Sequence, residues 1–198
     1  MTNSLGRDPE GTAGRPAGKR QRLIAAASQL LHQQGVETTT LAGIAQAADV
    51  PVGNVYYYFK TKDDIIAAVI EAHVQQARAA LASIDGSHRS PKSRLKALVS
   101  QYADQSEVIA LYGCPHGSLC SELDKRPSRP GFALAELMGV PIAWAEEQFR
   151  SLGRPDAHDL AVSLIAAYEG SALLANTFRD PDILAREARR LNRWIDTL

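Results

Sequence analysis

Apolar side chains in this chain recur at the spacing of an α-helix, and this periodicity is the feature that most constrains its fold. In the first periodic segment they fall at i, i+1, i+4, i+7 and i+8, which places them on one face of a helix. The residues of this stripe are Leu23, Ile24, Ala27, Leu30 and Leu31. No segment alternates apolar and polar residues between hairpin turns, the pattern typical of β-strands. The sequence therefore predicts an all-α fold of about nine helices.

Helix-ending and helix-capping residues divide the N-terminal part into four predicted helices. Gly35 ends the first helix, since glycine is favoured just past a helix C-terminus. The threonines at 38–40 offer N-caps for a short second helix. Pro51 suits the first turn of a third helix, where its missing N–H would have no partner. Thr61 caps a long fourth helix, and Asp64 three residues on completes the pattern of a capping box.

The remainder of the chain is also predicted to be helical. After a break at 85–90, helices are expected over 90–112, 118–125, 132–152 with a kink at Pro141, 155–178 and 181–198, with loops at 113–117 and 126–131. Residues 1–17 hold almost no large apolar side chain, so a disordered tail is expected there. A helix-turn-helix domain would follow at 18–64, and a larger helical regulatory and dimerisation domain at 65–198.

The overall composition is that of a globular protein. Of the 198 residues, 45% are apolar and 22% are charged, which is enough to form a core. No apolar stretch approaches the ~20 residues of a membrane helix, and the N-terminus lacks the apolar segment of a signal peptide. We therefore expect a cytoplasmic protein with no membrane partner, in which Cys114 and Cys120 stay reduced.

Charge is unevenly distributed, although the formal net charge is zero. Residues 1–62 carry seven Lys and Arg against four Asp and Glu, and the rest carries fifteen against eighteen. The N-terminal part is therefore +3 and the remainder −3. A basic head on an acidic body is typical of a DNA-binding module fused to a regulatory domain.

The second and third predicted helices have the spacing of a helix-turn-helix, in which the third helix enters the DNA major groove. Val55 and Phe59 lie four residues apart and fit the buried back of that helix. Asn54 then lies off this axis, as do two tyrosines. Gly53 at the helix start has no side chain, so the backbone can come close to DNA.

Three consecutive tyrosines, Tyr56 to Tyr58, stand out in a chain with few aromatic residues. Successive helical residues point 100° apart, so at least one ring must face solvent or a partner. Tyrosine hydroxyls donate to phosphates, and the rings can contact thymine methyls. Lys60 and Lys62 can pair with the DNA backbone, although lysines at helix ends can also be merely solvated. A basic arm of Arg15, Lys19 and Arg20 can likewise touch DNA or remain a solvated terminus.

The segments TTLAGIA at 39–45 and ADVPVGNVYYYFKTKD at 48–63 resemble the DNA-binding domain of the TetR family of transcription regulators. The resemblance covers about residues 19–66. It implies a mainly helical homodimer that represses transcription at double-stranded operator DNA. It also implies that Thr40 caps the second helix and meets a phosphate, that Asn54 and the Gly53 backbone lie at the groove, and that Lys62 binds a phosphate.

One departure from the family pattern concerns Pro51 and Val52, where many members carry Ser, Lys or Gln. Val52 can make only apolar contacts, for example with a thymine methyl. We therefore expect little direct base readout and more readout of DNA shape. The expected DNA-binding residues are Thr40, Pro51, Val52, Gly53, Asn54, Tyr56, Tyr57, Tyr58, Lys60 and Lys62.

The two C-terminal helices are expected to form a dimer interface. Residues 155–178 are rich in small side chains that let helices approach closely, and 181–198 present a stripe that includes Leu184, Leu191 and Ile195. Two such helices from each chain could form a four-helix interface, or both could pack within the monomer. A dimer would place two recognition helices about 34–36 Å apart, in successive major grooves of a near-palindrome.

A small-molecule effector is expected to bind in the larger domain. Aromatic and Met side chains line many ligand cavities, although at helical spacing they also fill cores. Candidates for the pocket are Tyr102, Tyr112, Cys114, His116, Met138, Trp144, Phe149, Tyr168, Asn176 and Phe178. The mixture predicts a moderately apolar ligand with a few polar handles. Since the fourth helix links body to head, its movement would change the spacing of the recognition helices.

The segment from Gly113 to Gly117 allows three interpretations. A metal site could use Cys114, His116 and Cys120, but the spacing is not a familiar zinc pattern and a fourth ligand is missing. A redox or electrophile switch could use Cys114 and Cys120, because a helix N-terminus can lower the pKa of Cys114. The simplest interpretation is a tight connection between helices, with Cys120 packed as a small apolar residue.

Other functions lack a matching set of residues. No Gly-x-Ser-x-Gly elbow, P-loop or dinucleotide fingerprint is present, and the histidines at 32, 73, 88, 116 and 158 are scattered, so no enzyme is expected. No cofactor or metal is expected either. A ligand-binding helical protein without DNA function would leave Tyr56 to Lys62 unexplained. The sequence does not distinguish a repressor from an activator, and repression is the usual mode of the family.

Overall fold

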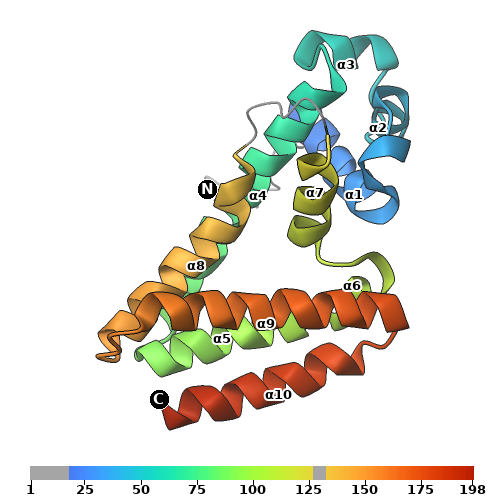
Figure 1. Ribbon diagram of the computed structural model, residues 1–198. Coiled ribbons are helices and arrows are strands. Elements are labelled where there is room, and N and C mark those ends of the chain that lie inside the picture. Colours follow the sequence, from blue (N-terminus) through green and yellow to red (C-terminus); the bar gives the residue numbers. More distant parts are fainter. Residues whose placement is uncertain (1–17, 127–132) are drawn as a thin grey trace, which may run out of the picture.

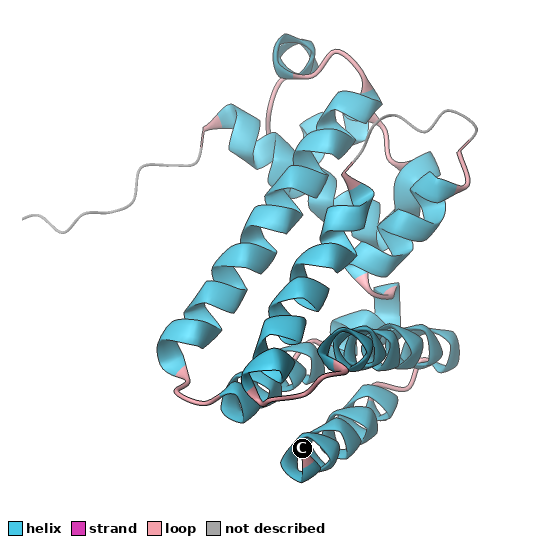
Figure 2. Cartoon of the chain, turned by 60° about the vertical axis from the view of Figure 1, so that its left-hand side comes forward, coloured by secondary structure: helices cyan, strands magenta, loops and turns pink. Residues whose placement is uncertain are grey.

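The computed structural model describes residues 18–126 and 133–198, and within these ranges the chain forms ten α-helices and no strand (Figures 1 and 2). The expected tail at 1–17, with Arg15, and the expected loop beyond residue 126 lie outside the described residues. The helices are α1 (Lys19–Thr38), α2 (Leu41–Ala47), α3 (Val52–Tyr58), α4 (Lys62–Ser87), α5 (Pro91–Ala103), α6 (Ser106–Tyr112), α7 (Pro115–Asp124), α8 (Leu134–Ser151), α9 (Ala157–Phe178) and α10 (Asp182–Thr197). The predicted all-α class is confirmed.

In the head, formed by α1 to α3, the residues that the sequence indicated lie at or near the helix ends, although α1 continues past Gly35 to Thr38. Gly35 adopts φ +80° and interrupts α1. Thr40 caps α2, with its Oγ1 accepting a hydrogen bond from the Gly43 N–H at 3.0 Å. Pro51 is the N-cap of α3, one position before the first helical residue. These local signals explain why one longer helix and two seven-residue helices fold within about forty residues.

The long helix α4 starts at the predicted capping box. Thr61 Oγ1 accepts a hydrogen bond from the Asp64 N–H at 3.1 Å, and Asp64 Oδ2 accepts one from the Thr61 N–H at 2.9 Å. The helix continues to Ser87, three residues into the expected break. It packs against α1 and α8, and Figure 1 shows it running from the head to the layer formed by α5, α9 and α10.

Two predictions for the middle of the chain were wrong. The helix expected over 90–112 is interrupted at Asp104 and Gln105, where the Gln105 N–H donates to the Tyr102 carbonyl, three residues back. This tight turn lets α5 pack on α10 while α6 packs on α9. The loop expected over 113–117 is shorter, because α7 begins at Pro115.

The apolar core is continuous between head and body. One cluster joins Val55 and Phe59 of the head to Leu119 and Leu123 of α7 and Leu137 of α8. Two further clusters fill the space between α5, α6, α8, α9 and α10. The domain boundary expected at residue 64 lies in the first turn of α4, so this helix belongs to both parts.

Helix α9 is the one described helix that is long and apolar enough to cross a membrane. Its apolar composition has another explanation within the fold. A buried face containing Ala161, Leu164, Ile165 and Ala172 packs against α6, α8 and α10. Core helices of globular proteins share this property, so the composition of α9 is weak evidence for a membrane span.

Candidate nucleic-acid interface and effector cavity

The recognition helix α3 has one buried side and one exposed side. Val55 and Phe59 are buried in the core of the head, as their spacing predicted. Tyr56, Tyr57 and Tyr58 are 49%, 78% and 37% exposed. The rings of Tyr57 and Tyr58 contact each other edge to face, with centroids 5.0 Å apart. All three tyrosines are therefore available to a partner without unfolding the head.

The start of α3 is open to close approach. A Cβ atom added at Gly53 would meet no atom of the chain within 4 Å, so the protein's own packing does not require glycine there. Val52 and Pro51 are exposed beside it, and Asn54 is half-buried. This surface is free of bulky side chains at the end of the helix that would enter a groove.

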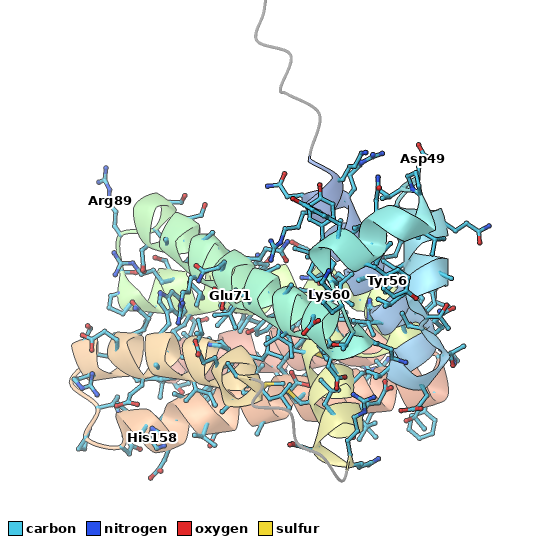
Figure 3. The ribbon with its side chains drawn as sticks, turned by 90° about the horizontal axis from the view of Figure 1, so that it is seen from above. Asp49, Tyr56, Lys60, Glu71, Arg89 and His158 are labelled. Carbon is cyan, nitrogen blue, oxygen red and sulfur yellow. The ribbon has the colours of Figure 1, made fainter. Side chains whose placement is uncertain are left out.

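Three of the predicted DNA-binding side chains form hydrogen bonds with backbone groups near helix ends: those of Thr40, Lys60 and Lys62. Besides the Thr40 cap, the Lys60 ammonium donates to the Tyr56 carbonyl at 2.7 Å, and the Lys62 ammonium donates to the Glu37 carbonyl at 3.2 Å. An ammonium has three N–H donors, so each lysine retains donors for a phosphate. In Figure 3, Tyr56 and Lys60 both lie on the head.

The two described residues of the predicted basic arm lie at the start of α1. Lys19 is exposed, and the Arg20 guanidinium lies over the Phe59 ring at 5.4 Å. Arg20 is thus tied to the back of α3 by a cation–π contact.

A cavity of about 490 Å³ lies between the head and the body. Its wall includes residues from α1 and α4 as well as from α5 to α9. Five of the predicted pocket residues line it: Tyr102, Cys114, His116, Met138 and Tyr168. The wall also contains polar residues that were not predicted from the sequence: Ser28, Gln29, His32, His73, Gln76, Gln101, Gln105 and Glu169. Several of these residues lie on α1 and α4, which were predicted to form the head and its link to the body. Helical periodicity does not indicate that a cavity lies beside a helix.

The remaining predicted pocket residues lie outside the wall of this cavity. Tyr112 contacts the His32 ring edge to face at 5.7 Å, and the Trp144 indole N–H donates to Asp85 Oδ2 at 3.0 Å. Phe149 is fully buried and packs against Trp194. The Asn176 amide donates to the Ala110 carbonyl at 3.1 Å. These side chains fill the core or tie helices together, and Phe178 is exposed at the end of α9.

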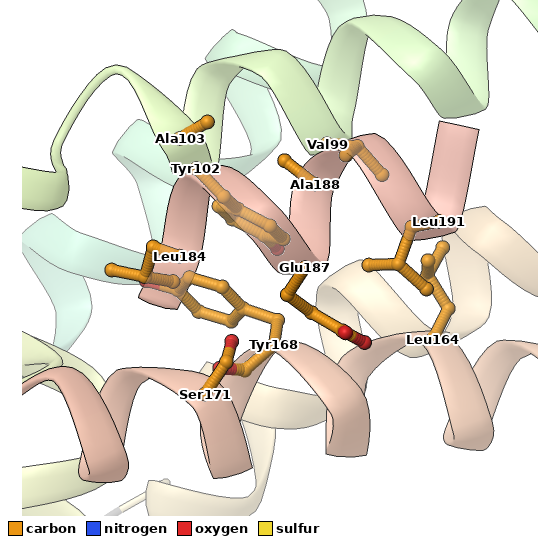
Figure 4. A pocket seen from close by; sticks show the side chains of 10 residues that line it. All are labelled: Val99, Tyr102, Ala103, Leu164, Tyr168, Ser171, Leu184, Glu187, Ala188 and Leu191. Carbon is orange, nitrogen blue, oxygen red and sulfur yellow. The ribbon is translucent and has the colours of Figure 1, made fainter. Parts of the chain in front are cut away.

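A second hollow, of about 10 Å³, lies beside the larger cavity and has room for about one water molecule (Figure 4). Tyr102 and Tyr168 line both spaces, and their rings stack with centroids 3.9 Å apart. The stacked pair therefore lies between α5 and α9 at the boundary of the larger cavity. The small hollow cannot hold an organic effector.

Three histidines from different helices line the larger cavity. His73 Nε2 lies 2.7 Å from Ser28 Oγ, and the rings of His73 and His116 are 5.1 Å apart. His32 Nε2 lies 2.8 Å from the Gly113 carbonyl oxygen. Burial, together with the neighbouring histidines, lowers the pKa of His116 to about 4 and also lowers that of His73. His73 and His116 are therefore neutral at pH 7.

Cys114 is buried, and its thiol is not activated. Its Sγ–H donates to Glu169 Oε1 at 3.2 Å, and burial and Glu169 raise the pKa of the thiol to about 12. The Gly117 N–H at the start of α7 does favour the thiolate, but this effect is smaller than that of burial. Burial also raises the pKa of Cys120. The redox interpretation needs a lowered pKa at Cys114, and the pKa is instead raised, because burial and Glu169 outweigh the helix N-terminus.

A metal site at this segment finds no support in the geometry. Across the described residues, no three His, Cys, Asp or Glu side chains come together as metal ligands. Cys114 instead caps α7, with its Sγ accepting from the Gly117 N–H at 3.4 Å. Cys120 makes only a long contact with the Leu134 carbonyl, at 3.9 Å. The interpretation as a connection between helices fits these contacts.

Helix α7 connects the cavity to the head. Its first residues line the cavity, and further along the helix Glu122 Oε2 accepts a hydrogen bond from the Val36 N–H at 2.6 Å. Just beyond the helix, Arg126 pairs with Asp63 at 2.8 Å, at the start of α4. A displacement of α7 would therefore reach both the end of α1 and the start of α4.

A helix-turn-helix head with an exposed recognition helix, joined to a helical body, defines the class of helix-turn-helix transcription regulators. Residues 23–69 match the family described as "Bacterial regulatory proteins, tetR family". The transcriptional regulator AcuR of Cereibacter sphaeroides is 31% identical, over 93% of this chain and 91% of the relative. The chain belongs to the TetR family, whose members bind DNA as dimers.

Two further similarities cover most of the chain. An uncharacterised helix-turn-helix regulator in the lacX 3′ region of Lactococcus lactis is 28% identical, over 83% of this chain and 87% of the relative. The crystal structure of a regulatory protein TetR from Rhodobacter sphaeroides superposes with a TM-score of 0.77 at 28% identity, over 88% of this chain and 97% of the other. These relatives are regulators of transcription, and the similarity extends beyond the DNA-binding head into the body.

Proposed function

We propose that this protein is a cytoplasmic transcription repressor that binds a near-palindromic operator as a dimer and releases it when a small molecule enters the cavity. The observation that carries the proposal is the exposed row Tyr56 to Tyr58 on α3, in the head of a TetR-family fold. Large aromatic side chains in a row, exposed on a rigid helix, are expected at an interface.

The DNA contacts are assigned by position. Tyr56, Tyr57 and Tyr58 would donate to phosphates or touch base methyls, and Val52 would meet a thymine methyl. The backbone at Gly53 would approach the groove closely, since nothing in the chain covers it. Thr40, Lys60 and Lys62 would bind phosphates with the donors that capping leaves free, and Pro51 and Asn54 would complete the surface.

The dimer surface is assigned mainly to α9. This helix exposes Val162, Leu173, Leu174 and Phe178 in addition to its buried face. Several large apolar side chains exposed on one helix are typical of a subunit interface. Helix α10, in contrast, buries Leu184, Leu191 and Ile195 within the monomer and exposes mainly charged residues. We propose that α9 forms the apolar centre of the interface and α10 its polar rim.

The effector would act through α7 and α4. A molecule in the cavity would touch His116 at the start of α7 and His73 on α4, and these helices contact the head through Glu122, Val36 and Asp63. A shift of either helix would change the distance between the two α3 helices of a dimer. Such a change prevents both from entering successive major grooves.

The test is binding of the purified protein to the DNA upstream of its own gene, followed by selection from random sequences if that DNA is not the operator. Tyr57→Ala is expected to weaken operator binding about tenfold with an unchanged melting temperature, because Tyr57 is 78% exposed. Lys62→Ala should weaken binding to all sequences and reduce the salt dependence by about one phosphate contact. Tyr57→Phe distinguishes a hydroxyl contact from a ring contact. Failure to select any DNA sequence would refute the proposal.

A further inference from the structure

Three of the chain's five histidines line the cavity between head and body, and they come from three different helices. His32 lies on α1, His73 on α4 and His116 on α7. No Lys or Arg is among the described residues that line the cavity. The wall therefore offers cationic charge only through its imidazoles, and only when they are protonated.

We propose that the effector is an organic acid whose carboxylate is bound by His116 together with His32 and His73, and that its binding is coupled to uptake of a proton. This inference deepens the proposed function, because it names the chemical class of the molecule that would release operator DNA. The apolar part of the ligand would lie against Leu81, Leu137 and Met138, which line the same cavity.

The imidazoles differ in how many of their nitrogens are already used. Within the described residues, the imidazole of His116 makes no hydrogen bond, and its ring lies next to that of His73, with centroids 5.1 Å apart. His73 pairs with Ser28 through Nε2, while its Nδ1 is buried without a partner. His32 uses Nε2 on the Gly113 carbonyl. His116 thus has both nitrogens available, which makes it the first candidate to meet a carboxylate.

The other titratable groups of the cavity are neutral or already occupied. Burial raises the pKa of Glu169, Cys114, Tyr102 and Tyr168, which favours the protonated form of each. Glu169 Oε1 accepts from the Cys114 thiol, and its Oε2 lies against Gly117. A cationic ligand would meet one carboxyl group, Glu169, whose protonated form burial favours, whereas an anionic ligand would meet the unpaired imidazole nitrogens of His116 and His73.

Binding of an anion would reverse the effect of burial on His116. The nearby carboxylate favours the imidazolium, so the pKa of His116 would rise from about 4 in the empty protein to a higher value in the complex. The observed affinity would then fall about tenfold for each pH unit between those two pKa values. Above the pKa of the complex the affinity would level off.

The experiment uses three matched series of straight-chain compounds, with four to ten carbon atoms, that differ only in the head group: carboxylates, primary alcohols and primary amines. Thermal unfolding of the full chain at pH 6 identifies which compounds bind. Calorimetry from pH 5.5 to 8 then measures affinity, and buffers of different ionisation enthalpy report the protons taken up. We expect the carboxylates to bind best, with uptake of about one proton and an affinity that falls with rising pH.

His116→Gln keeps a polar side chain that cannot become charged. It should lower carboxylate affinity about tenfold or more at pH 6 and abolish proton uptake, while alcohol binding stays unchanged. His158→Gln is the matched control, because His158 is exposed on α9 beside Glu146 and away from the cavity. It should leave affinity and proton uptake at wild-type values.

Several results would overturn the inference. They are preferential binding of amines, equal binding of alcohols and carboxylates, binding without proton uptake, and no thermal shift from any carboxylate. The number of protons that the wild type takes up on carboxylate binding is measured without any variant, so this test remains valid even if His116→Gln fails to fold. Operator binding is measured in the same preparations to distinguish failure of this inference from failure of the repressor proposal. If the effector is neutral or cationic, the protein should still bind operator DNA, whereas a protein that is not a repressor should not.

Discussion

Within α3, burial changes completely from one residue to the next. Val55 is fully buried and Tyr56 is half exposed, although they are adjacent in the sequence. The helical rotation of 100° per residue causes this change, and it lets seven residues serve as both core and interface. Substitutions on the buried side should therefore cost stability, and those on the exposed side should cost DNA binding.

Gly53 gives the sharpest prediction for a single residue. Gly53→Ala should leave the free energy of unfolding unchanged or raise it by up to about 1 kcal/mol, because alanine favours helix over glycine and its Cβ would meet nothing in the chain. Operator affinity should nevertheless fall, since the methyl group would keep the backbone from the groove.

The matched control for Gly53→Ala is Gly86→Ala. Gly86 is also helical and equally open, but it lies in the last turn of α4, far from α3. Denaturant unfolding and operator binding should show stabilisation in both variants and loss of affinity only at Gly53. Equal operator affinity in the two variants would show that the backbone does not approach DNA at Gly53.

At the scale of the element, α7 is one of the helices whose contacts reach both the cavity and the head, and Glu122 makes its contact with α1. Glu122→Ala removes the acceptor of the Val36 N–H, and Val36 is buried. An unsatisfied buried donor costs about 1–3 kcal/mol, so thermal stability should fall. The effector should also release operator DNA less effectively, because the hydrogen bond that links α7 to the end of α1 would be lost.

Two variants help to separate these effects. Glu122→Gln keeps an oxygen acceptor and should retain most of the stability. Glu107→Ala removes an exposed carboxylate from the neighbouring helix α6 and should change neither property. The measurements are melting temperature and the concentration of effector that releases half of the operator. An unchanged effector response in Glu122→Ala would exclude α7 as the connecting element.

The ends of most helices could be predicted because capping acts between residues that are close in sequence. Thr40 and Thr61 cap their helices as the sequence indicated, and Gly35 interrupts α1 three residues before its last residue. The break between α5 and α6 could not be predicted, since neither Asp104 nor Gln105 is a helix-breaking glycine or proline. Its cause is long-range, because the two helices pack on different partners.

The recognition helix was easier to predict than the cavity for the same reason. In a seven-residue helix, the periodicity of consecutive residues is enough to predict which side is buried and which is exposed. The cavity wall combines His32, His73, His116 and Glu169 from four helices, and no local pattern connects them. Aromatic residues such as Phe149 and Trp144 were poor guides, because at helical spacing they fill the core.

At the scale of the whole molecule, head and body share one apolar cluster, so we expect them to unfold together. Protonation of a cavity histidine should therefore change the free energy of unfolding of the whole chain. The pKa of His116 is about 4 when folded, against 6.5 for a free histidine. The unfolded chain therefore binds more protons between these values, and stability falls as pH drops from 6.5 toward 4. The raised pKa of Glu169 acts in the opposite sense, because it favours the folded state at low pH.

Comparison of variants isolates the histidine contribution. Between pH 7 and pH 4.5 the wild type should lose more stability than His116→Gln, by on the order of 1–2 kcal/mol. Urea unfolding at several pH values measures the difference, and Glu169 contributes equally to both proteins. Parallel pH profiles of the two would contradict the lowered pKa of His116.

We propose that the assembly of two chains depends on the exposed apolar residues of α9. Leu173 is 66% exposed in the single chain, and a carboxylate there would be buried in a dimer without a partner, which costs several kcal/mol. Leu173→Glu should therefore shift the protein to monomers in sedimentation experiments and weaken operator binding. Its melting temperature should fall only as far as dimerisation itself stabilises the chain.

The control for Leu173→Glu lies on α10. Arg189→Glu reverses an exposed charge on the helix that we assign to the rim of the interface. Charges at a rim are worth little, because water and salt screen them, so this variant should remain a dimer at physiological salt. Dissociation by Arg189→Glu but not by Leu173→Glu would place the centre of the interface on α10. Since the distance between the two α3 helices is fixed by the interface, that outcome would also change which operator half-site spacing the protein can read.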